Sequence, residues 1–302
     1  MRITRLALCA ALSAAAPALA EDLYALAGNI NPTLFKLDPI AGTTLSWTSV
    51  TGQEALFGGL ACDAAGKFYS IDGYNDGNPD RLFRIDNSTG AGTVIGPTNF
   101  NWNFRCVTFN PATGTLYGST DNNLYTMNTA TGAATFVAQI SGPNLDQLTA
   151  LAINSAGQAY GTDIGDTDLF SINLETGQAT WIASVGQSGN WFNDLAFDSA
   201  GVLHGARFNG GVYKIDLTTA VQTYEFAGNF TGLVYFGAGE DCDANCYGST
   251  IQPILNVNDF VCFQAKFAAG DSAANCDHST APPTLNVADF ICFMNEYAAG
   301  CP

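Results

Sequence analysis

The chain has 302 residues, of which 27 are acidic and 10 are basic, so its formal net charge is −17. A surface this negative repels phosphate backbones and anionic lipids, which argues against nucleic-acid binding and against attachment to a membrane surface. The same charge suits calcium, cationic partners and neutral glycans.

The first twenty residues have the pattern of an export signal. Arg2 and Arg5 precede a largely apolar run over residues 6–16, and Ala-Leu-Ala at 18–20 fits a cleavage site. We therefore predict a signal peptide over 1–20, a mature chain that begins at Glu21, and a secreted or cell-surface location. Cleavage would leave eight basic against 27 acidic residues, a net charge of −19. No later stretch approaches the length of about 18 apolar residues that a membrane span needs.

Residues 21–237 carry a repeat of alternating apolar and polar residues that ends in Asp or Asn and a turn. The five copies are LFKLDPIAG, LFRIDNSTG, LYTMNTATG, LFSINLETG and VYKIDLTTA, with the turn residues Asp38, Asp86, Asn128, Asn173 and Asp216. Alternation with period two predicts half-buried strands, and the turn residues predict hairpins.

A second pattern precedes four of these copies, as in LACDAAGKFYSID and LAINSAGQAYGTD. Together the two patterns predict four strands every 42 to 48 residues, which is typical of β-propeller blades. The first blade lacks its first strand, and a matching strand occurs at residues 231–236. We therefore predict an all-β, five-bladed propeller in which the N- and C-terminal strands close one blade.

Ligands of propellers usually meet the loops that enter the innermost strands. In this region we predict a possible ligand site at the propeller axis, formed by Arg105, Trp191, Asn193 and Asp194. The run that begins at Asn193 loosely resembles the N-G-L-A-F run of gluconolactonase-like enzymes, in which the asparagine is a metal ligand. That resemblance implies a metal-dependent lactonase or hydrolase as the alternative function.

Three other features of the propeller region are open to more than one interpretation. We interpret His204 as a packing residue, because it takes a strand position at which the other repeats have tyrosine. The acidic inserts at 72–80 and 161–168 are interpreted as solvated turns, with calcium binding as the alternative. Cys62 and Cys106 are predicted either as buried free thiols or as a disulfide.

Residues 238–302 form a second domain that contains a duplication with a period of 30. Residues 244–271 align with 274–301, and 16 of the 28 aligned positions are identical. Each copy has short oxygen-bearing side chains, then Asn-x-x-Asp, then apolar residues at helical spacing. A loop of alternating oxygen ligands closed by a carboxylate on the first helical turn is suited to calcium. The candidate ligands are Asp241, Asp243, Asn245, Asn256 and Asp259 in the first copy, and Asn275, Asp277, Ser279, Asn286 and Asp289 in the second.

This double loop and helix resembles a dockerin, and its cysteines and its Ala-Ala-Gly-Cys-Pro ending resemble the GC-type dockerin tails of secreted planctomycete proteins. The resemblance covers about a fifth of the chain and implies two calcium sites and a role in docking or anchoring. The chain departs from an ordinary dockerin in two ways. About six extra residues separate the early ligands of each loop from the late ones. The positions that cellulosomal dockerins use to select a partner are Val257-Asn258 and Val287-Ala288 in place of a Ser/Thr pair. A helix pair that is stapled by disulfides and binds no metal is the alternative.

Six cysteines lie in this domain, and fifteen pairings are possible. The repeat favours a symmetric set, with Cys246 bound to Cys262, Cys276 to Cys292, and Cys242 to Cys301. A domain of about sixty residues buries little surface, so bridges or metals would supply stability that its core cannot.

From these features we expect a non-enzymatic extracellular recognition protein. Its propeller would bind an unknown ligand, for which a glycan is one candidate, and its tail would bind calcium and an unknown receptor at the cell surface. A third possibility is that the tail is a sorting tag removed after export.

Overall fold

The structure is a computed structural model that describes residues 22–28, 31–52, 58–72, 79–100, 104–165, 167–184, 189–236, 246, 257–271, 274–276 and 285–299. The chain divides into two compact units, Met1–Tyr235 and Phe236–Pro302. Each unit is described below by itself. The predicted signal peptide lies outside the described residues.

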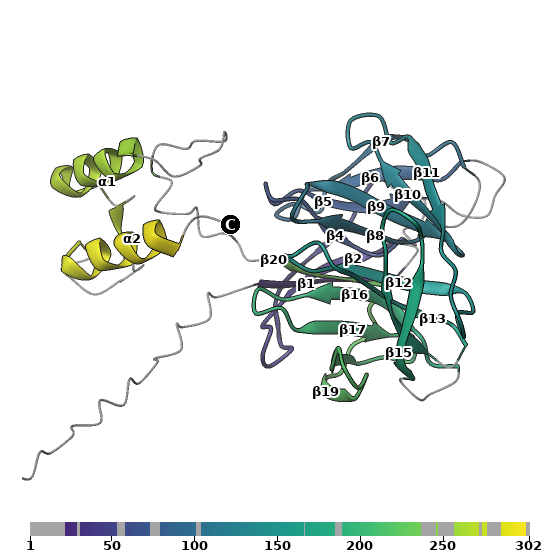
Figure 1. Cartoon of the computed structure of the whole chain (residues 1–302). Helices are drawn as coiled ribbons and strands as arrows, with labels where there is room; N and C mark the ends of the chain where they lie inside the picture. Colours follow the sequence, from purple (N-terminus) through teal and green to yellow (C-terminus); the bar gives the residue numbers. More distant parts are fainter. Residues whose placement is uncertain are drawn as a thin grey trace, which may run out of the picture. The chain divides into compact units, whose positions relative to one another are not determined.

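The first unit is a five-bladed β-propeller, which confirms the predicted fold (Figure 1). Within the described residues its strands form five antiparallel sheets of four strands each. From the inner to the outer strand, the blades are as follows: blade 1, β20 (Gly232–Phe236), β1 (Asp22–Ala27), β2 (Thr33–Leu37) and β3 (Thr44–Ser49); blade 2, β4 (Ala61–Cys62), β5 (Phe68–Asp72), β6 (Arg81–Ile85) and β7 (Gly92–Pro97); blade 3, β8 (Phe104–Asn110), β9 (Thr115–Thr120), β10 (Asn123–Met127) and β11 (Ala134–Gln139); blade 4, β12 (Leu148–Ile153), β13 (Ala159–Asp163), β14 (Asp168–Ile172) and β15 (Ala179–Ser184); blade 5, β16 (Phe192–Phe197), β17 (Leu203–Arg207), β18 (Val212–Ile215) and β19 (Gln222–Phe226).

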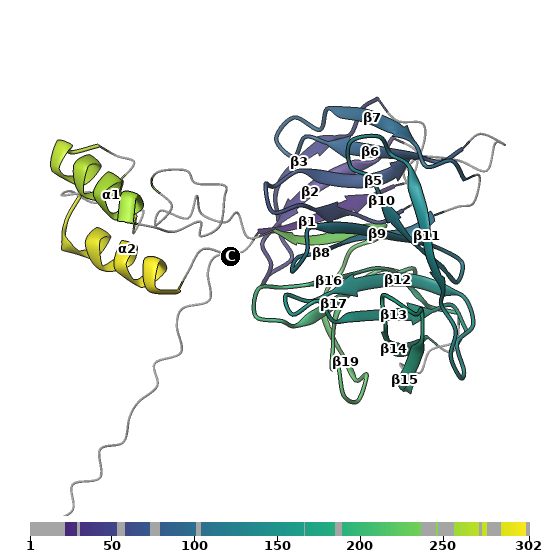
Figure 2. The ribbon, with the colours of Figure 1, turned by 45° about the horizontal axis from the view of Figure 1, so that its top comes forward.

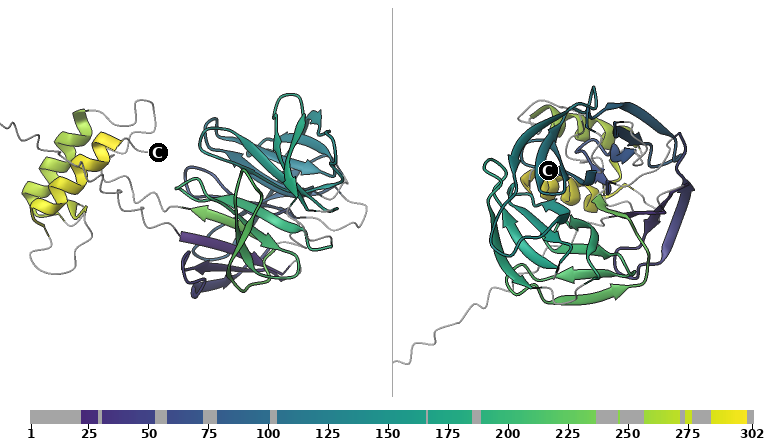
Figure 3. Two further views of the ribbon diagram at one scale, coloured as in Figure 1. Left: turned by 60° about the horizontal axis from the view of Figure 1, so that its bottom comes forward. Right: turned by 90° about the vertical axis from the view of Figure 1, so that its right-hand side faces the viewer.

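Blade 1 joins the two ends of the propeller, as the sequence predicted. Its inner strand β20 comes from the end of the unit and pairs with β1 from the beginning, and Figure 2 shows the two side by side. The backbone N–H of Thr231, just before β20, donates to the carbonyl of Leu26 at 2.8 Å. The blades can be followed around the closed ring in the right-hand view of Figure 3.

The apolar core lies between neighbouring blades. One buried cluster joins Leu124 of blade 3 to Leu151 and Phe170 of blade 4, and another joins Leu23 of blade 1 to Val212 of blade 5. Each sheet therefore needs apolar side chains on both faces, and an inner strand such as β12 is buried along its whole length.

The Asp or Asn of each repeat organises the turn between the third and fourth strands. In every blade its Oδ1 atom accepts hydrogen bonds from the N–H groups two and three residues later, at 2.7 to 3.0 Å. These bonds replace backbone pairing that the turn cannot make. In blade 2, the Ser88 hydroxyl and the Thr89 N–H also lower the pKa of Asp86 to about 2.

The fourth residue after this Asp or Asn has a left-handed backbone in all five blades. It is glycine in four of them, including Gly90 (φ 71°) and Gly177 (φ 72°), and it is Ala220 (φ 55°) in blade 5. A Cβ atom on Gly177 would lie 2.2 Å from the carbonyl oxygen of Gln139 in the preceding blade. The glycine therefore serves two purposes: it allows the backbone conformation and it lets two blades approach.

The described part of the second unit contains both copies of the predicted helix, α1 (Val257–Ala269) and α2 (Val287–Ala299). Phe263 and Phe293 are buried and stack with ring centroids 4.2 Å apart. Phe260, Phe267 and Phe290 pack around them at helical spacing. None of the helices among the described residues is long and apolar enough to cross a membrane.

Candidate functional site

The predicted axial residues lie where the inner strands begin. In an antiparallel four-stranded blade, the start of the first strand and the loop between the second and third strands share one end, which we call the loop face. The five residues that occupy equivalent places around the axis, one position before the repeated apolar residue, are Gly59, Cys106, Ala150, Asp194 and Gly232. Four of these five residues are small and uncharged, whereas the fifth, Asp194, carries a carboxyl group.

The Asp194 carboxylate is fully buried and is bound by backbone from three blades. Its Oδ2 accepts the N–H groups of Leu60 and Leu233, both at 2.9 Å, and its Oδ1 accepts the N–H of Leu195 at 3.0 Å. A Cβ atom on Gly59 would lie 3.0 Å from this carboxylate, so the glycine makes room for it. Burial raises the pKa of Asp194 to about 8, although the three N–H donors favour the charged form. Asp194 therefore connects blades 5, 1 and 2 through hydrogen bonds.

Asn193 and Trp191 make separate contacts on the same face. The Nδ2 atom of Asn193 donates to the carbonyl of Phe230 at 2.9 Å, in the segment that leads into β20. Trp191 stacks on Phe208, with ring centroids 4.3 Å apart and an interplanar angle of 22°. Sequence reasoning did not select Phe208, although an aromatic residue in the turn Phe-Asn-Gly-Gly is an available signal.

Arg105 lies beside two polar side chains of the loop face. Its Nε is 3.8 Å from the Oδ1 of Asp121, which also accepts a hydrogen bond from the Nε2 of Gln147. The Nε atom is buried and has no hydrogen-bond partner among the described residues. The contacts of Arg105 differ from those of Asn193, Asp194 and Trp191, so each of the four predicted residues has its own set of neighbours.

The ends of the acidic inserts are buried, which corrects our interpretation of them as solvated turns. Asp72 forms an ion pair with Arg81. Asp163 accepts the N–H groups of Asp146 at 3.0 Å and of Asp168 at 2.8 Å, and burial raises its pKa. These carboxylates brace the loops from inside, because buried backbone donors require partners.

His204 is more than a packing residue. Its buried ring lies between two carboxylates, with Nδ1 2.7 Å from Glu225 and Nε2 3.1 Å from Asp198, and its centroid is 4.5 Å from that of Tyr235 in β20. Glu225 also pairs with Lys214 at 3.2 Å. The cluster links blade 5 to the closing strand of blade 1.

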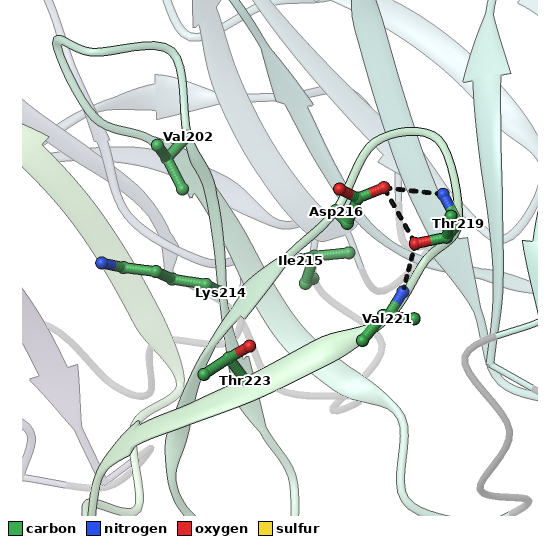
Figure 4. A pocket seen from close by; sticks show the side chains of 7 residues that line it. All are labelled: Val202, Lys214, Ile215, Asp216, Thr219, Val221 and Thr223. Atoms are coloured by element: carbon green, nitrogen blue, oxygen red, sulfur yellow. Dashed lines mark hydrogen bonds between the residues drawn. The ribbon is translucent and has the colours of Figure 1, made fainter.

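An open cavity of about 450 Å³ lies on the β18–β19 hairpin of blade 5 (Figure 4). Lys214, Asp216 and Thr219 contribute its polar lining. Figure 4 shows Asp216 turned toward Thr219, whose N–H and hydroxyl donate to its Oδ1 at 2.7 and 2.9 Å. The Asp216 carboxylate that lines the cavity is therefore already hydrogen-bonded within its own turn.

Both tail disulfides that fall within the described residues match the symmetric pairing. Cys246 is bound to Cys262 and Cys276 to Cys292, each across 16 residues. The third predicted pair, Cys242 with Cys301, lies outside the described residues. In the propeller, Cys62 and Cys106 are free thiols, and Cys106 is buried. Disulfides persist in oxidising compartments, so these bridges indicate such an environment.

The Asn-x-x-Asp motif of the second copy caps its helix. The Oδ1 of Asn286 accepts the N–H of Ala288 at 2.8 Å, and the Oδ2 of Asp289 accepts the N–H of Asn286 at 2.7 Å. This reciprocal pair is a capping box. Asp289 and its counterpart Asp259 are both fully buried on the first helical turn.

Four of the ten predicted calcium ligands can be located. Asp259, Asn275, Asn286 and Asp289 are described, whereas Asp241, Asp243, Asn245, Asn256, Asp277 and Ser279 lie outside the described residues. Across the described ranges, no group of three or more His, Cys, Asp or Glu side chains could hold a metal ion. The two buried carboxylates occupy equivalent positions of the duplicated helices, which is compatible with the calcium loops expected from the sequence.

Each tail helix also exposes apolar side chains at matching positions. Val257 and Val287 are exposed, as are Val261 and Ile291 one turn later, and Met294 extends the row on α2. These residues lie outside the aromatic core of the unit. The duplication therefore produces two similar apolar strips.

The fold and these sites define a five-bladed propeller followed by a disulfide-bonded helical unit. The chain belongs to the family described as Repeat of unknown function (DUF6923), whose model matches residues 69–239. A chain in the crystal structure of a nidogen/laminin complex is similar in structure, with a TM-score of 0.52 and 12% identity, and the match covers 72% of this chain and 99% of that one.

A second solved structure, a protein of unknown function from Bacteroides thetaiotaomicron VPI-5482, has a TM-score of 0.49 and 18% identity, and covers 74% of this chain and 66% of that one. At such identities the likeness to solved structures concerns the fold alone. No curated protein matches the chain.

Proposed function

We propose that this chain is an exported, non-enzymatic recognition protein, in which the loop face of the propeller binds an extracellular ligand and the tail docks the protein to a cell-surface receptor. The observation that carries the proposal is the pair of exposed apolar strips on α1 and α2. A small unit that leaves several large aliphatic side chains in water on equivalent turns of both helices has a surface suited to a partner.

Calcium is the cofactor of the proposed docking unit. Asp259 with Asp241, Asp243, Asn245 and Asn256 would hold one ion, and Asp289 with Asn275, Asp277, Ser279 and Asn286 would hold the other. Each ion would be held by carboxylate oxygens together with neutral amide or hydroxyl oxygens, which is the kind of ligand set that calcium prefers. The dockerin resemblance supports this assignment, and the capping box of α2 supports the same placement of Asp289 at a helix start.

Calorimetric titration of the mature protein with CaCl2, after removal of ions with EDTA, tests the metal assignment. We expect two binding events, of which the variants Asp259→Asn and Asp289→Asn each abolish one. Asp271→Asn, which removes the same charge just after α1, is the matched control and should keep both. Absence of heat in the unaltered protein would reject the calcium assignment.

Docking is tested separately, by fractionation of the tagged protein in its native host. The unaltered protein should fractionate with the cell envelope. The double variant Val261→Asp/Ile291→Asp should be released to the medium, because it places charge in both apolar strips. Equal retention of the two proteins would contradict docking through these helices.

A further inference from the structure

The loop face of blade 5 carries a stacked aromatic pair, in which Trp191 is half-buried and Phe208 is exposed. Trp191 directly precedes β16 and Phe208 directly follows β17, and the N–H of Phe208 donates to the carbonyl of Trp191 at 2.9 Å. Their rings stack at 4.3 Å. Phe208 is 47% exposed, so one of its ring faces covers Trp191 while much of the side chain contacts water.

The pair is held rigidly. Phe208 is the second residue of a turn closed by the N–H of Gly210 on the carbonyl of Arg207 at 3.0 Å, and the N–H of Gly211 donates to Gly228 at 2.6 Å. Beneath the turn, the buried guanidinium of Arg207 lies over the rings of Phe192 and Tyr213, 5.0 and 5.1 Å from their centroids. An aromatic ring fixed in this way loses little conformational freedom when a ligand binds.

The position of Phe208 is unusual for this propeller. The other exposed large apolar residues of the described propeller lie on outer strands or at the turns between third and fourth strands; they are Ile40, Leu45, Trp47, Val94, Phe136, Trp181, Val221 and Tyr224. Turn residues at loop tips are normally small or polar, so a half-exposed phenylalanine is unexpected in such a turn. Loops on a rigid scaffold are where binding residues concentrate.

Amide side chains flank the aromatic pair. The N–H of Asn209 donates to the Oδ1 of Asn190 at 3.2 Å, which ties together the two loops that carry the rings. Asn193 follows Trp191 by two residues. Amides offer both donors and acceptors to hydroxyl groups. Arg207, the basic residue of this turn, is buried, and the whole protein is strongly negative, so the platform disfavours an anionic ligand.

We infer that Trp191 and Phe208 form a stacking platform for a neutral sugar residue, with Asn190 and Asn209 beside it to meet the hydroxyl groups. A sugar ring has an apolar C–H face surrounded by hydroxyls, which matches an aromatic surface rimmed by amides. This inference rests on the proposed recognition function of the loop face and specifies its ligand class.

The test is calorimetry of the mature protein with four neutral hexasaccharides (cello-, xylo-, manno- and maltohexaose) and with polygalacturonate as an acidic arm. We expect at least one neutral hexasaccharide to bind, and Phe208→Ala and Phe208→Leu to weaken that binding by about tenfold or more, because leucine keeps bulk but removes the ring. Phe208→Tyr should retain it. The matched control is Phe136→Ala, which removes a phenylalanine that is 53% exposed on the outer strand β11, and it should change affinity less than about twofold.

Three outcomes would overturn the inference: no neutral hexasaccharide binds, only polygalacturonate binds, or the Phe208 variants bind as tightly as the unaltered protein. Phe208→Tyr and Phe136→Ala report whether a loss in Phe208→Ala comes from a general folding defect. Calcium titration and envelope fractionation of the same proteins address the tail. The sugar inference can therefore fail while the docking function stands, and the reverse.

Discussion

At the scale of single residues, the Asp194 carboxylate links pH to the stability of the ring. Burial raises its pKa to about 8 in the folded protein, compared with about 4 in an unfolded chain. Between these values the folded state holds a proton that the unfolded state has released, so the free energy of unfolding should fall as pH rises from about 4 to 8. The nearby thiol of Cys106, whose pKa burial raises to about 12, stays protonated throughout.

Urea unfolding at pH 5 and at pH 8 measures this effect when the unaltered protein is compared with Asp194→Asn. We expect the free energy of unfolding of the unaltered protein, relative to that of Asp194→Asn, to be higher at pH 5 than at pH 8. Asp194→Ala should be less stable at both, by about 2 to 5 kcal/mol, because the N–H groups of Leu60 and Leu233 lose their acceptor. An identical pH dependence in both proteins would contradict the assignment.

The structural role of Asp194 could be predicted only in part from the sequence. Its position at the start of an inner strand placed it near the axis, as the sequence predicted. Its partners are backbone groups 134 and 39 residues away, and they become neighbours only when the ring closes. A local pattern therefore indicated a ligand residue, whereas the tertiary contacts assign it a bracing role. The Trp191–Phe208 stack was missed for the same reason, because its two rings come from separate strands.

At the scale of structural elements, a hairpin turn depends on backbone conformation and, in some places, on the neighbouring blade. Gly177 (φ 72°), in the turn between the third and fourth strands of blade 4, faces the carbonyl of Gln139 in the preceding blade. Gly201 (φ 78°), in the turn between the first and second strands of blade 5, has open space around it. Gly177→Ala should cost about 2 to 5 kcal/mol, and Gly201→Ala only about 1 to 2 kcal/mol for the left-handed backbone. Chemical denaturation of the two variants compares the costs directly, and equal losses would show that the contact between blades has no effect.

Ala220 gives a second prediction, about the turn between the third and fourth strands of blade 5. Replacement by glycine would relieve about 1 kcal/mol of backbone strain at φ 55°, but it would remove a buried methyl group worth about 0.8 kcal/mol. We therefore expect Ala220→Gly to lie within about 1 kcal/mol of the unaltered protein in the same denaturation experiment. A large loss would mean that the methyl group contributes more to the packing of blade 5 than its area suggests.

The elements themselves were well determined by the sequence, because a repeated pattern fixes strand, turn and blade count together. Period-two alternation and the recurring Asp or Asn identified the blades, and the unmatched strand at residues 231–236 identified the closure. Register shifts were not predictable. In each blade the pairing with the outermost strand slips by one residue, for example between Leu82 and Phe83. Such a bulge places an extra residue in one strand of the pair and increases the local twist.

At the scale of the whole molecule, the two units should respond differently to calcium. The propeller is stabilised by apolar clusters between blades, whereas the described part of the tail has a small aromatic core, two disulfides and two fully buried aspartates. A ligand that binds only the folded tail stabilises that unit by mass action. In differential scanning calorimetry of the mature protein, CaCl2 in place of EDTA should raise the temperature of one transition and leave the other within about 1 °C. Asp259→Asn/Asp289→Asn should remove the shift without changing the propeller transition. If calcium moves both transitions equally, the two units unfold together and the ion acts on the whole molecule; if it moves neither, the buried aspartates serve only as helix caps.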